Sequence, residues 1–321
     1  MSPGDEAAGT SRMTQQPASR YEQPSGTVPL PTESRRVNLL RRLGSSGLLI
    51  CAVLFILFKL PVWVFSVVVS CFVMAGLFEF FTMIRNRGIL VNRPLGLLLG
   101  VLFCALVTWH SFVDGGLITP PIGGTGATLM NWLWDVFWPF AIISLCIRQV
   151  TRGNTFEAIS GMATTLFGLA YIGALFSYFF YIRALEPEQG AERILYLLLV
   201  TKIGDVGAYA IGNLMGRHAF VPRISPRKTI EGFIGAILTS GVVAVAAQPL
   251  LGRPLAPVPS FLLGVFLGLF GQLGDLAESL IKRDCQVKDT GTLMPGLGGI
   301  LDVVDSLLFT APLFYAFLIF G

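Results

Sequence analysis

Long apolar runs separated by short polar segments dominate the chain from residue 44 to its end. They fall at nine places: 44–59, 61–83, 95–113, 130–147, 159–182, 194–215, 232–250, 259–281 and 300–320. Most approach the ~20 apolar residues that an α-helix needs to cross the hydrocarbon core of a bilayer. Pro61 divides the first two runs, whose combined length exceeds one span, so a tight hairpin is expected there. The pattern predicts an all-α polytopic membrane protein with about nine transmembrane helices.

Composition agrees with a membrane protein. Of the 321 residues, 53% are hydrophobic and 13% are charged, against roughly 25% charged in soluble domains. The five cysteines and two histidines form no metal-ligand spacing. No signal-peptide pattern precedes the first apolar run. Residues 1–43 instead predict a disordered polar tail whose end, beside the membrane, is basic.

The distribution of cations predicts the orientation. If the N-terminus lies in the cytoplasm, 18 of the 23 Lys and Arg residues fall in cytoplasmic segments and the C-terminus lies outside. The two loops richest in charge, 216–231 and 282–299, then share the cytoplasmic face. We therefore expect N-terminal transmembrane helices over 44–193 and a C-terminal catalytic transmembrane region over 194–321.

The first polar group of this catalytic region lies within an apolar helix. Asp205 is followed at helical spacing by Tyr209, Gly212 and Gly216, so all four are expected on one face. The two glycines allow another helix to approach closely. A carboxylate within the membrane is usually functional, although a purely structural bond to a neighbouring helix is an alternative.

The second group begins with Ser225 and Pro226, which fit the N-cap and first position of a helix. Free N–H groups at such a helix start, together with Arg227 and Lys228, would bind an anion. The alternative is that these cations only set the membrane orientation.

The third group is a polar stripe on an otherwise apolar helix. Asp275, Glu278, Ser279 and Lys282 follow one another at positions i, i+3, i+4 and i+7. Carboxylates suit Mg²⁺ and a lysine suits a phosphate. Internal salt bridges are the alternative explanation.

The fourth group is a glycine-rich turn followed by two carboxylates. Lys288 and Asp289 precede Pro-Gly-Leu-Gly-Gly at 295–299, and Asp302 and Asp305 follow within one helical turn of each other. Such a turn exposes backbone amides to a ligand. Two carboxylates this close favour a divalent cation between them.

In order and spacing, these four groups resemble the phosphatidate cytidylyltransferases, also called CDP-diacylglycerol synthases. The motifs are D-x-x-A-Y with its glycines, S-P-x-K-T-x-E-G, and S-x-x-K-R-x₄-K-D followed by P-G-x-G-G-x-x-D-x-x-D. The match covers about residues 200–306, and the nine-span layout is similar over 44–320. Two positions depart from the family pattern: Leu297 stands where His is usual, and Val303 where Arg is usual.

The resemblance implies transfer of the cytidylyl group of CTP to phosphatidic acid, giving CDP-diacylglycerol and pyrophosphate. It implies Mg²⁺ or another divalent cation, with a second metal ion left open, at an active site facing the cytoplasm of a bacterial inner membrane. Bilayer lipids are implied partners, a homodimer is compatible, and nucleic acid is not expected. The competing interpretations are a CTP-dependent lipid-alcohol kinase and a transporter with intramembrane ion sites.

The resemblance also implies roles for individual residues. The catalytic residues would be Asp205, Lys228, Lys282 and Asp289. The substrate-binding residues would be Tyr209, Ser225, Arg227, Thr229, Glu231, Ser279, Arg283, Lys288, Gly298 and Gly299. The metal ligands would be Asp275, Asp302 and Asp305.

Overall fold

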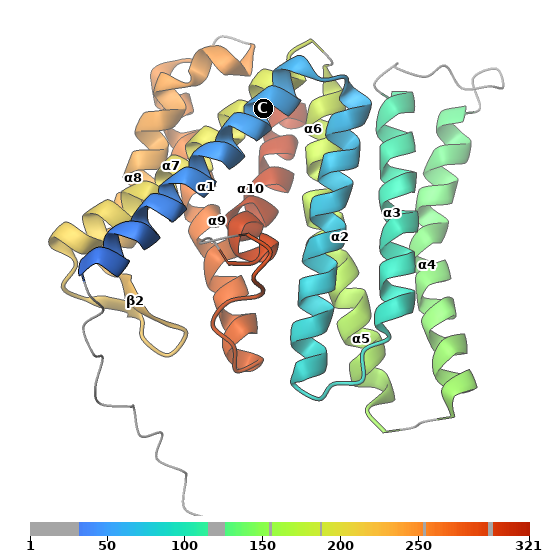
Figure 1. Cartoon of the computed structure of the whole chain (residues 1–321). Helices are drawn as coiled ribbons and strands as arrows, with labels where there is room; N and C mark the ends of the chain where they lie inside the picture. Colours follow the sequence, from blue (N-terminus) through green and yellow to red (C-terminus); the bar gives the residue numbers. More distant parts are fainter. Residues whose placement is uncertain (1–31, 115–125, 154–155, 187, 253–254, 295–297) are drawn as a thin grey trace, which may run out of the picture.

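The fold is a bundle of membrane helices with one small hairpin (Figure 1). The computed structural model describes residues 32–114, 126–153, 156–186, 188–252, 255–294 and 298–321. Its helices are α1 Thr32–Lys59, α2 Val62–Asn86, α3 Arg93–Asp114, α4 Gly126–Arg152, α5 Ala158–Gly168, α6 Tyr178–Leu185, α7 Gly190–Met215, α8 Ile230–Ala246, α9 Pro257–Asp284 and α10 Ile300–Phe320. A π-helical turn, Leu169–Ala174, lies between α5 and α6, and a 3₁₀ turn, Gln248–Leu251, follows α8.

Each of the nine predicted apolar runs is helical, which confirms the all-α membrane class. Within the described residues, six helical segments are long and apolar enough to cross a membrane. They are α2, α3 as far as Phe112, the interrupted segment Ala158–Leu185, α7, α9 and α10. The number of nine spans stays a prediction. The predicted hairpin between the first two runs is present, because α1 ends at Lys59 and α2 begins at Val62.

The first helix starts earlier than expected. Residues 1–31 of the predicted tail lie outside the described residues, but α1 begins at Thr32, well before the apolar run at 44. Arg and Leu, which fill much of this basic segment, are good helix formers and continue the apolar helix backwards. The end of the predicted tail is therefore helical.

The last four helices hold the polar motifs. Helix α8 packs against both α7 and α9, and α10 packs against α9. In Figure 1, α10 runs between this group and α2, and it contacts α2, α6 and α7 as well. The start of α10 is therefore enclosed by elements from both halves of the chain.

Small residues permit the close packing of α7 on α8. A Cβ atom added at Gly232 would lie 3.2 Å from the Cα atom of Gly212 and 2.8 Å from the carbonyl oxygen of Ala208. The two backbones thus touch where the sequence predicts a small-residue contact.

The segment at Ser225 and Pro226 is a strand, and the predicted helix start there is wrong. Strand β2, Ser225–Thr229, pairs antiparallel with β1, Ala219–Val221. The helix begins only at Ile230, where Thr229 acts as the N-cap and its hydroxyl accepts a hydrogen bond from the Gly232 N–H at 3.1 Å. Pairing with β1 keeps the segment extended, and proline is tolerated in such an edge strand. Arg227 and Lys228 therefore lie on a hairpin arm rather than in the first turn of a helix.

Candidate functional site

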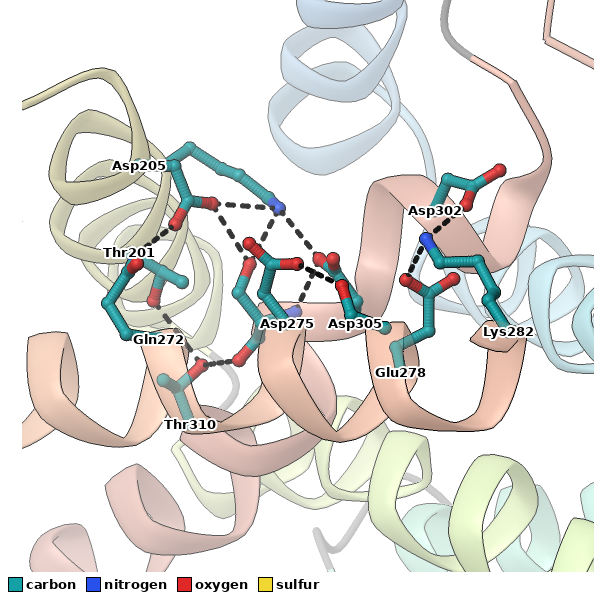
Figure 2. Close-up of polar contacts among 12 residues, drawn as sticks. Thr201, Asp205, Gln272, Asp275, Glu278, Lys282, Asp302, Asp305 and Thr310 are labelled. Atoms are coloured by element: carbon teal, nitrogen blue, oxygen red, sulfur yellow. Dashed lines mark hydrogen bonds and ion pairs between the residues drawn. The ribbon is translucent and has the colours of Figure 1, made fainter. Parts of the chain in front are cut away.

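The polar motifs converge where α7, α9 and α10 meet. Figure 2 shows Asp205 from α7, Asp275 and Glu278 from α9, and Asp302 and Asp305 from α10, with lysine side chains between them. Four of these five carboxylates were assigned catalytic or metal-binding roles from sequence. The structure brings together side chains up to a hundred residues apart in the chain.

Three carboxylates form the most compact part of this cluster. Oxygen atoms of Asp275, Glu278 and Asp305 all lie within 4.8 Å of one another. Asp275 is also 2.6 Å from the Nζ atom of Lys228, which reaches in from strand β2. Glu278 has a side chain only 1% exposed. Although it contacts Lys282, it accepts no hydrogen bond from the described part of the chain.

Asp302 lies beside this cluster and has different partners. Its Oδ1 atom is 2.7 Å from the Nζ atom of Lys282, which also pairs with Glu278 one helical turn earlier. Its Oδ2 atom accepts hydrogen bonds from the N–H and hydroxyl groups of Thr290, both at 3.0 Å, and from the Gly299 N–H at 2.7 Å. Asp302 therefore anchors the glycine turn and Lys282, while its role as a metal ligand stays a prediction.

The arrangement of charges suits one divalent cation. Among the described residues, five carboxylates of the site contact or adjoin three ammonium groups, so with every group ionised the site carries an excess of two negative charges. Oxygen atoms are the ligands that Mg²⁺ prefers. Apart from the ion pair with Lys282, the buried Glu278 oxygens have no hydrogen-bond partner among the described residues, so they retain lone pairs that could bind such an ion. The residues at hand thus fit a metal ion held by Asp275, Glu278 and Asp305.

Helix α2 supplies an unpredicted support for the glycine turn. Glu79, 3% exposed, accepts hydrogen bonds from the Ile300 and Leu301 N–H groups, both at 3.0 Å, and from the Thr290 hydroxyl at 3.2 Å. These N–H groups at the start of α10 would otherwise lack partners. A Cβ atom added at Gly299 would lie 2.5 Å from a Glu79 oxygen. The glycine therefore allows the close approach of a buried carboxylate.

A residue from the N-terminal transmembrane region, 44–193, lies near the same helices. Tyr171, in the π-helical turn, is 6% exposed, and its ring meets that of Phe309 edge-on at 6.4 Å between centroids. Its hydroxyl has no hydrogen-bond partner within the described chain. Interruptions of this helical type often lie at functional sites.

Several predicted substrate-binding residues line the mouth of the site. The Ser279 hydroxyl lies 3.5 Å from Asp275, and the Arg283 Nε atom donates to the Ile224 carbonyl at 3.1 Å, joining α9 to the hairpin. Glu231 accepts from the Arg217 and His218 N–H groups and contacts the His218 ring at 2.6 Å. It thus secures the other side of the hairpin.

Other predicted residues lie at the surface. Arg227, Lys288 and Asp289 are exposed, and Tyr209 is 73% exposed. Ser225 is half-buried in strand β2, and Gly298 adopts φ +101°, a conformation that favours glycine. Apart from Gly298, which lies close to Asp302, these residues make no hydrogen bond or ion pair with the central carboxylates within the described chain, so their roles stay predictions. Leu297, one of the two departures from the family pattern, lies outside the described residues.

Sequence reasoning assigns no role to Glu79 or Lys202, and it places Glu278 on the polar stripe without naming it among the metal ligands. Each is a charged residue in an apolar helix, and such a residue is costly unless it is paired or functional. That signal is present for all three, but the partner of Glu79 is more than two hundred residues away and cannot be identified by spacing.

Comparison with known proteins agrees with the motifs. The model of the cytidylyltransferase family matches residues 40–320. The phosphatidate cytidylyltransferase of Bacillus subtilis is 35% identical over 257 residues, which cover 80% of this chain and 88% of the relative. The protein of the same name from Synechocystis is 34% identical over 295 residues, which cover 84% of this chain and 92% of the relative. The chain therefore belongs to the cytidylyltransferase family.

Proposed function

We propose that this membrane enzyme is a nucleotidyltransferase that transfers the cytidylyl group of CTP to phosphatidic acid, giving CDP-diacylglycerol and pyrophosphate. One observation carries the proposal: five carboxylates and three lysines converge at the motifs that the chain shares with its family. Relatives that match more than four fifths of their length are phosphatidate cytidylyltransferases by name.

The chemistry needs charge neutralisation rather than a base. A phosphate oxygen of phosphatidic acid attacks the α-phosphorus of CTP, and the bond from that phosphorus to the bridging oxygen of the β-phosphate breaks. Pyrophosphate leaves with that oxygen. Since the attacking oxygen is already anionic at neutral pH, the main requirements are in-line placement and cations around the phosphates. A site of lysines and carboxylates, with no catalytic histidine among the described residues that line it, meets this requirement.

The metal in this proposal is Mg²⁺ or a similar divalent cation. Asp275, Glu278 and Asp305 would hold it, whereas Asp302, which the sequence also assigns to the metal, is bound to Lys282 and to the glycine turn. When bound, it would withdraw charge from the phosphate oxygens and orient them.

The lysines of the site have a second task in this reaction. In the structure, Lys228 is paired with Asp275, and Lys282 with Glu278 and Asp302. Triphosphate and metal would provide new partners for both sides of these pairs, so each ammonium would turn toward a phosphate oxygen without leaving a carboxylate unpaired. The exposed Arg227 and Lys288 would attract the nucleotide to the mouth of the site.

The location follows from the orientation predicted by the cations. We place the site at the cytoplasmic face of a bacterial inner membrane, where CTP arrives from water and phosphatidic acid from the bilayer. A homodimer is a further prediction.

The test is product analysis with two labels. Purified protein is incubated with phosphatidic acid, Mg²⁺ and CTP carrying radioactive phosphorus at either the α or the γ position. We expect the α label in the lipid fraction and the γ label in pyrophosphate, with neither product when Mg²⁺ is chelated. In a parallel incubation with diacylglycerol in place of phosphatidic acid, a lipid-alcohol kinase would instead place the γ label in the lipid. No labelled lipid from either nucleotide would contradict enzymatic transfer altogether.

A further inference from the structure

Lys202 is a charged residue in the transmembrane helix α7 that the proposed chemistry does not yet use. Its Nζ atom lies 2.7 Å from the Ser306 hydroxyl, 3.3 Å from an Asp205 oxygen and 3.8 Å from an Asp305 oxygen. A lysine within a membrane segment is costly, so this position requires compensating partners. Its partners come from α10 as well as from its own helix.

The hydrogen bonds around Lys202 have one consistent direction. The ammonium donates to the Ser306 hydroxyl oxygen, and that hydroxyl donates to Asp205 at 3.1 Å. Asp205 also accepts from the Gln272 amide at 2.9 Å. Lys202 also donates directly to Asp205 at 3.3 Å, so the Asp205 carboxylate is held from α7, α9 and α10 at once.

Asp305 connects this network to the candidate metal ligands. The carboxylate that faces Lys202 also belongs to the compact group with Asp275 and Glu278. Without Lys202, Asp205 and Asp305 would lose the one ammonium that adjoins both of them among the described residues. The excess of negative charge in the site would rise from two to three, more than one divalent cation neutralises. Two carboxylates with no cation between them repel and move apart.

We propose that Lys202 is a positioning residue of this enzyme: its tethered ammonium fixes Asp205 and Asp305, so that the oxygens of Asp275, Glu278 and Asp305 keep the arrangement that a single divalent cation needs. The inference rests on the proposed function for its activity readout. A purely structural ion pair between α7 and α10 is the alternative that the experiment must separate.

The experiment compares Lys202→Ala with Lys202→Arg and with Lys59→Ala, which removes an exposed lysine far from the site. Formation of labelled CDP-lipid is measured with and without methylammonium, which can enter the space left by the side chain. Tetramethylammonium at equal concentration is the control, because it is bulkier and has no N–H group. Unfolding temperature is measured in chelator with each amine, which gives a readout that needs neither metal nor turnover.

We expect Lys202→Ala to lose at least about 30-fold in kcat with less than a threefold change in KM for CTP. Methylammonium, but not tetramethylammonium, should raise the kcat of Lys202→Ala at least fivefold. It should also raise the unfolding temperature of this variant in chelator. Lys202→Arg should keep more activity than Lys202→Ala, and Lys59→Ala should equal the parent.

Two results would overturn the proposal. One is a Lys202→Ala kcat within threefold of the parent. The other is a loss that neither methylammonium nor Lys202→Arg relieves, since a site that needs only packing at this position gains nothing from a replacement cation. If Lys202→Ala is not recovered as folded protein, Lys202→Arg is compared with Lys202→Gln. A higher kcat for Lys202→Arg supports the proposal, and equal kcat values overturn it. A parent enzyme without CDP-lipid formation would instead contradict the proposed function.

Discussion

At the scale of single residues, the structure separates two aspartates that the sequence treats as a pair. Asp305 belongs to the compact carboxylate group, whereas Asp302 is bound to Lys282 and to the amides of the glycine turn. Their spacing of three residues is compatible with a shared metal, but their partners indicate different tasks. This difference can be measured.

We expect Asp305→Asn to abolish both turnover and tight binding of Mn²⁺ used as a substitute for Mg²⁺, because it removes a ligand from the cluster. Asp302→Asn should also lose turnover but retain Mn²⁺, since the lost contacts are those to Lys282 and Thr290. Isothermal titration of each purified variant with Mn²⁺ checks the prediction. Loss of Mn²⁺ binding in both variants would instead show that Asp302 is a metal ligand, as the sequence predicts.

Lys282 makes the most buried ion pair of the site, because Glu278 beside it is 1% exposed. Lys282→Ala should lower turnover on the order of 10²-fold if the ammonium contacts phosphate in the transition state. It should also destabilise the protein, since it leaves Glu278 without its cation. Kinetics and thermal unfolding are therefore measured together.

The double variant Lys282→Ala with Glu278→Gln is the control for stability. Removing both charges should recover much of the unfolding temperature but none of the turnover. Recovery of turnover together with stability would mean that Lys282 serves only to neutralise Glu278.

At the scale of elements, the start of α10 is held by a residue of α2. Glu79 accepts both of the first two N–H groups of this helix, so the position of Asp302 and Asp305 depends on contact between the two halves of the chain. The isolated catalytic helices α7 to α10 would lack this support. The motif region is thus not a self-sufficient unit.

Glu79→Ala should cost at least about 1–3 kcal/mol of unfolding free energy, because buried N–H donors lose their acceptor. Turnover should fall as well, since α10 carries two carboxylates of the site. Glu188→Ala, which removes an exposed carboxylate, is the matched control and should resemble the parent. Denaturant unfolding in detergent and CDP-lipid formation give the two readouts. Unchanged stability in Glu79→Ala would contradict the role of this clamp.

At the scale of the whole molecule, orientation is the prediction that the function depends on most. The hairpin with Arg223 and the loop after α9 must face the cytoplasm if CTP is to reach the lysines of the site. The start of α9, at Ala256, lies at the other end of the same helix and must face outward.

Single cysteines test this arrangement in a variant whose five native cysteines are replaced. We expect Arg223→Cys to react with an impermeant maleimide only in inside-out vesicles, and Ala256→Cys only in intact cells. Both positions are exposed in the structure, so access is limited by the membrane alone. Labelling of both residues from one side would overturn the predicted span count, because one span more or fewer between them reverses the result.

The sequence by itself determined the class of the protein, the helical runs and the family. Hydrophobic length and charge bias are local properties, and the bilayer converts them directly into helices and an orientation. The motifs at Asp205, Lys282 and Asp302 could be recognised because their spacing along each segment is short. The strand at Ser225 was missed, since its pairing with Ala219–Val221 overrides the local preference of Ser-Pro for a helix start.

Only the tertiary structure decided which charges meet. The packing of α7, α9 and α10 brings Lys202 to Asp305, and that of α2 on α10 brings Glu79 to Ile300. These pairs are separated by a hundred or more residues, so no periodicity predicts them. Each charge is costly within the membrane until it finds its partner, and the fold in which all of them do so is a property of the assembled bundle.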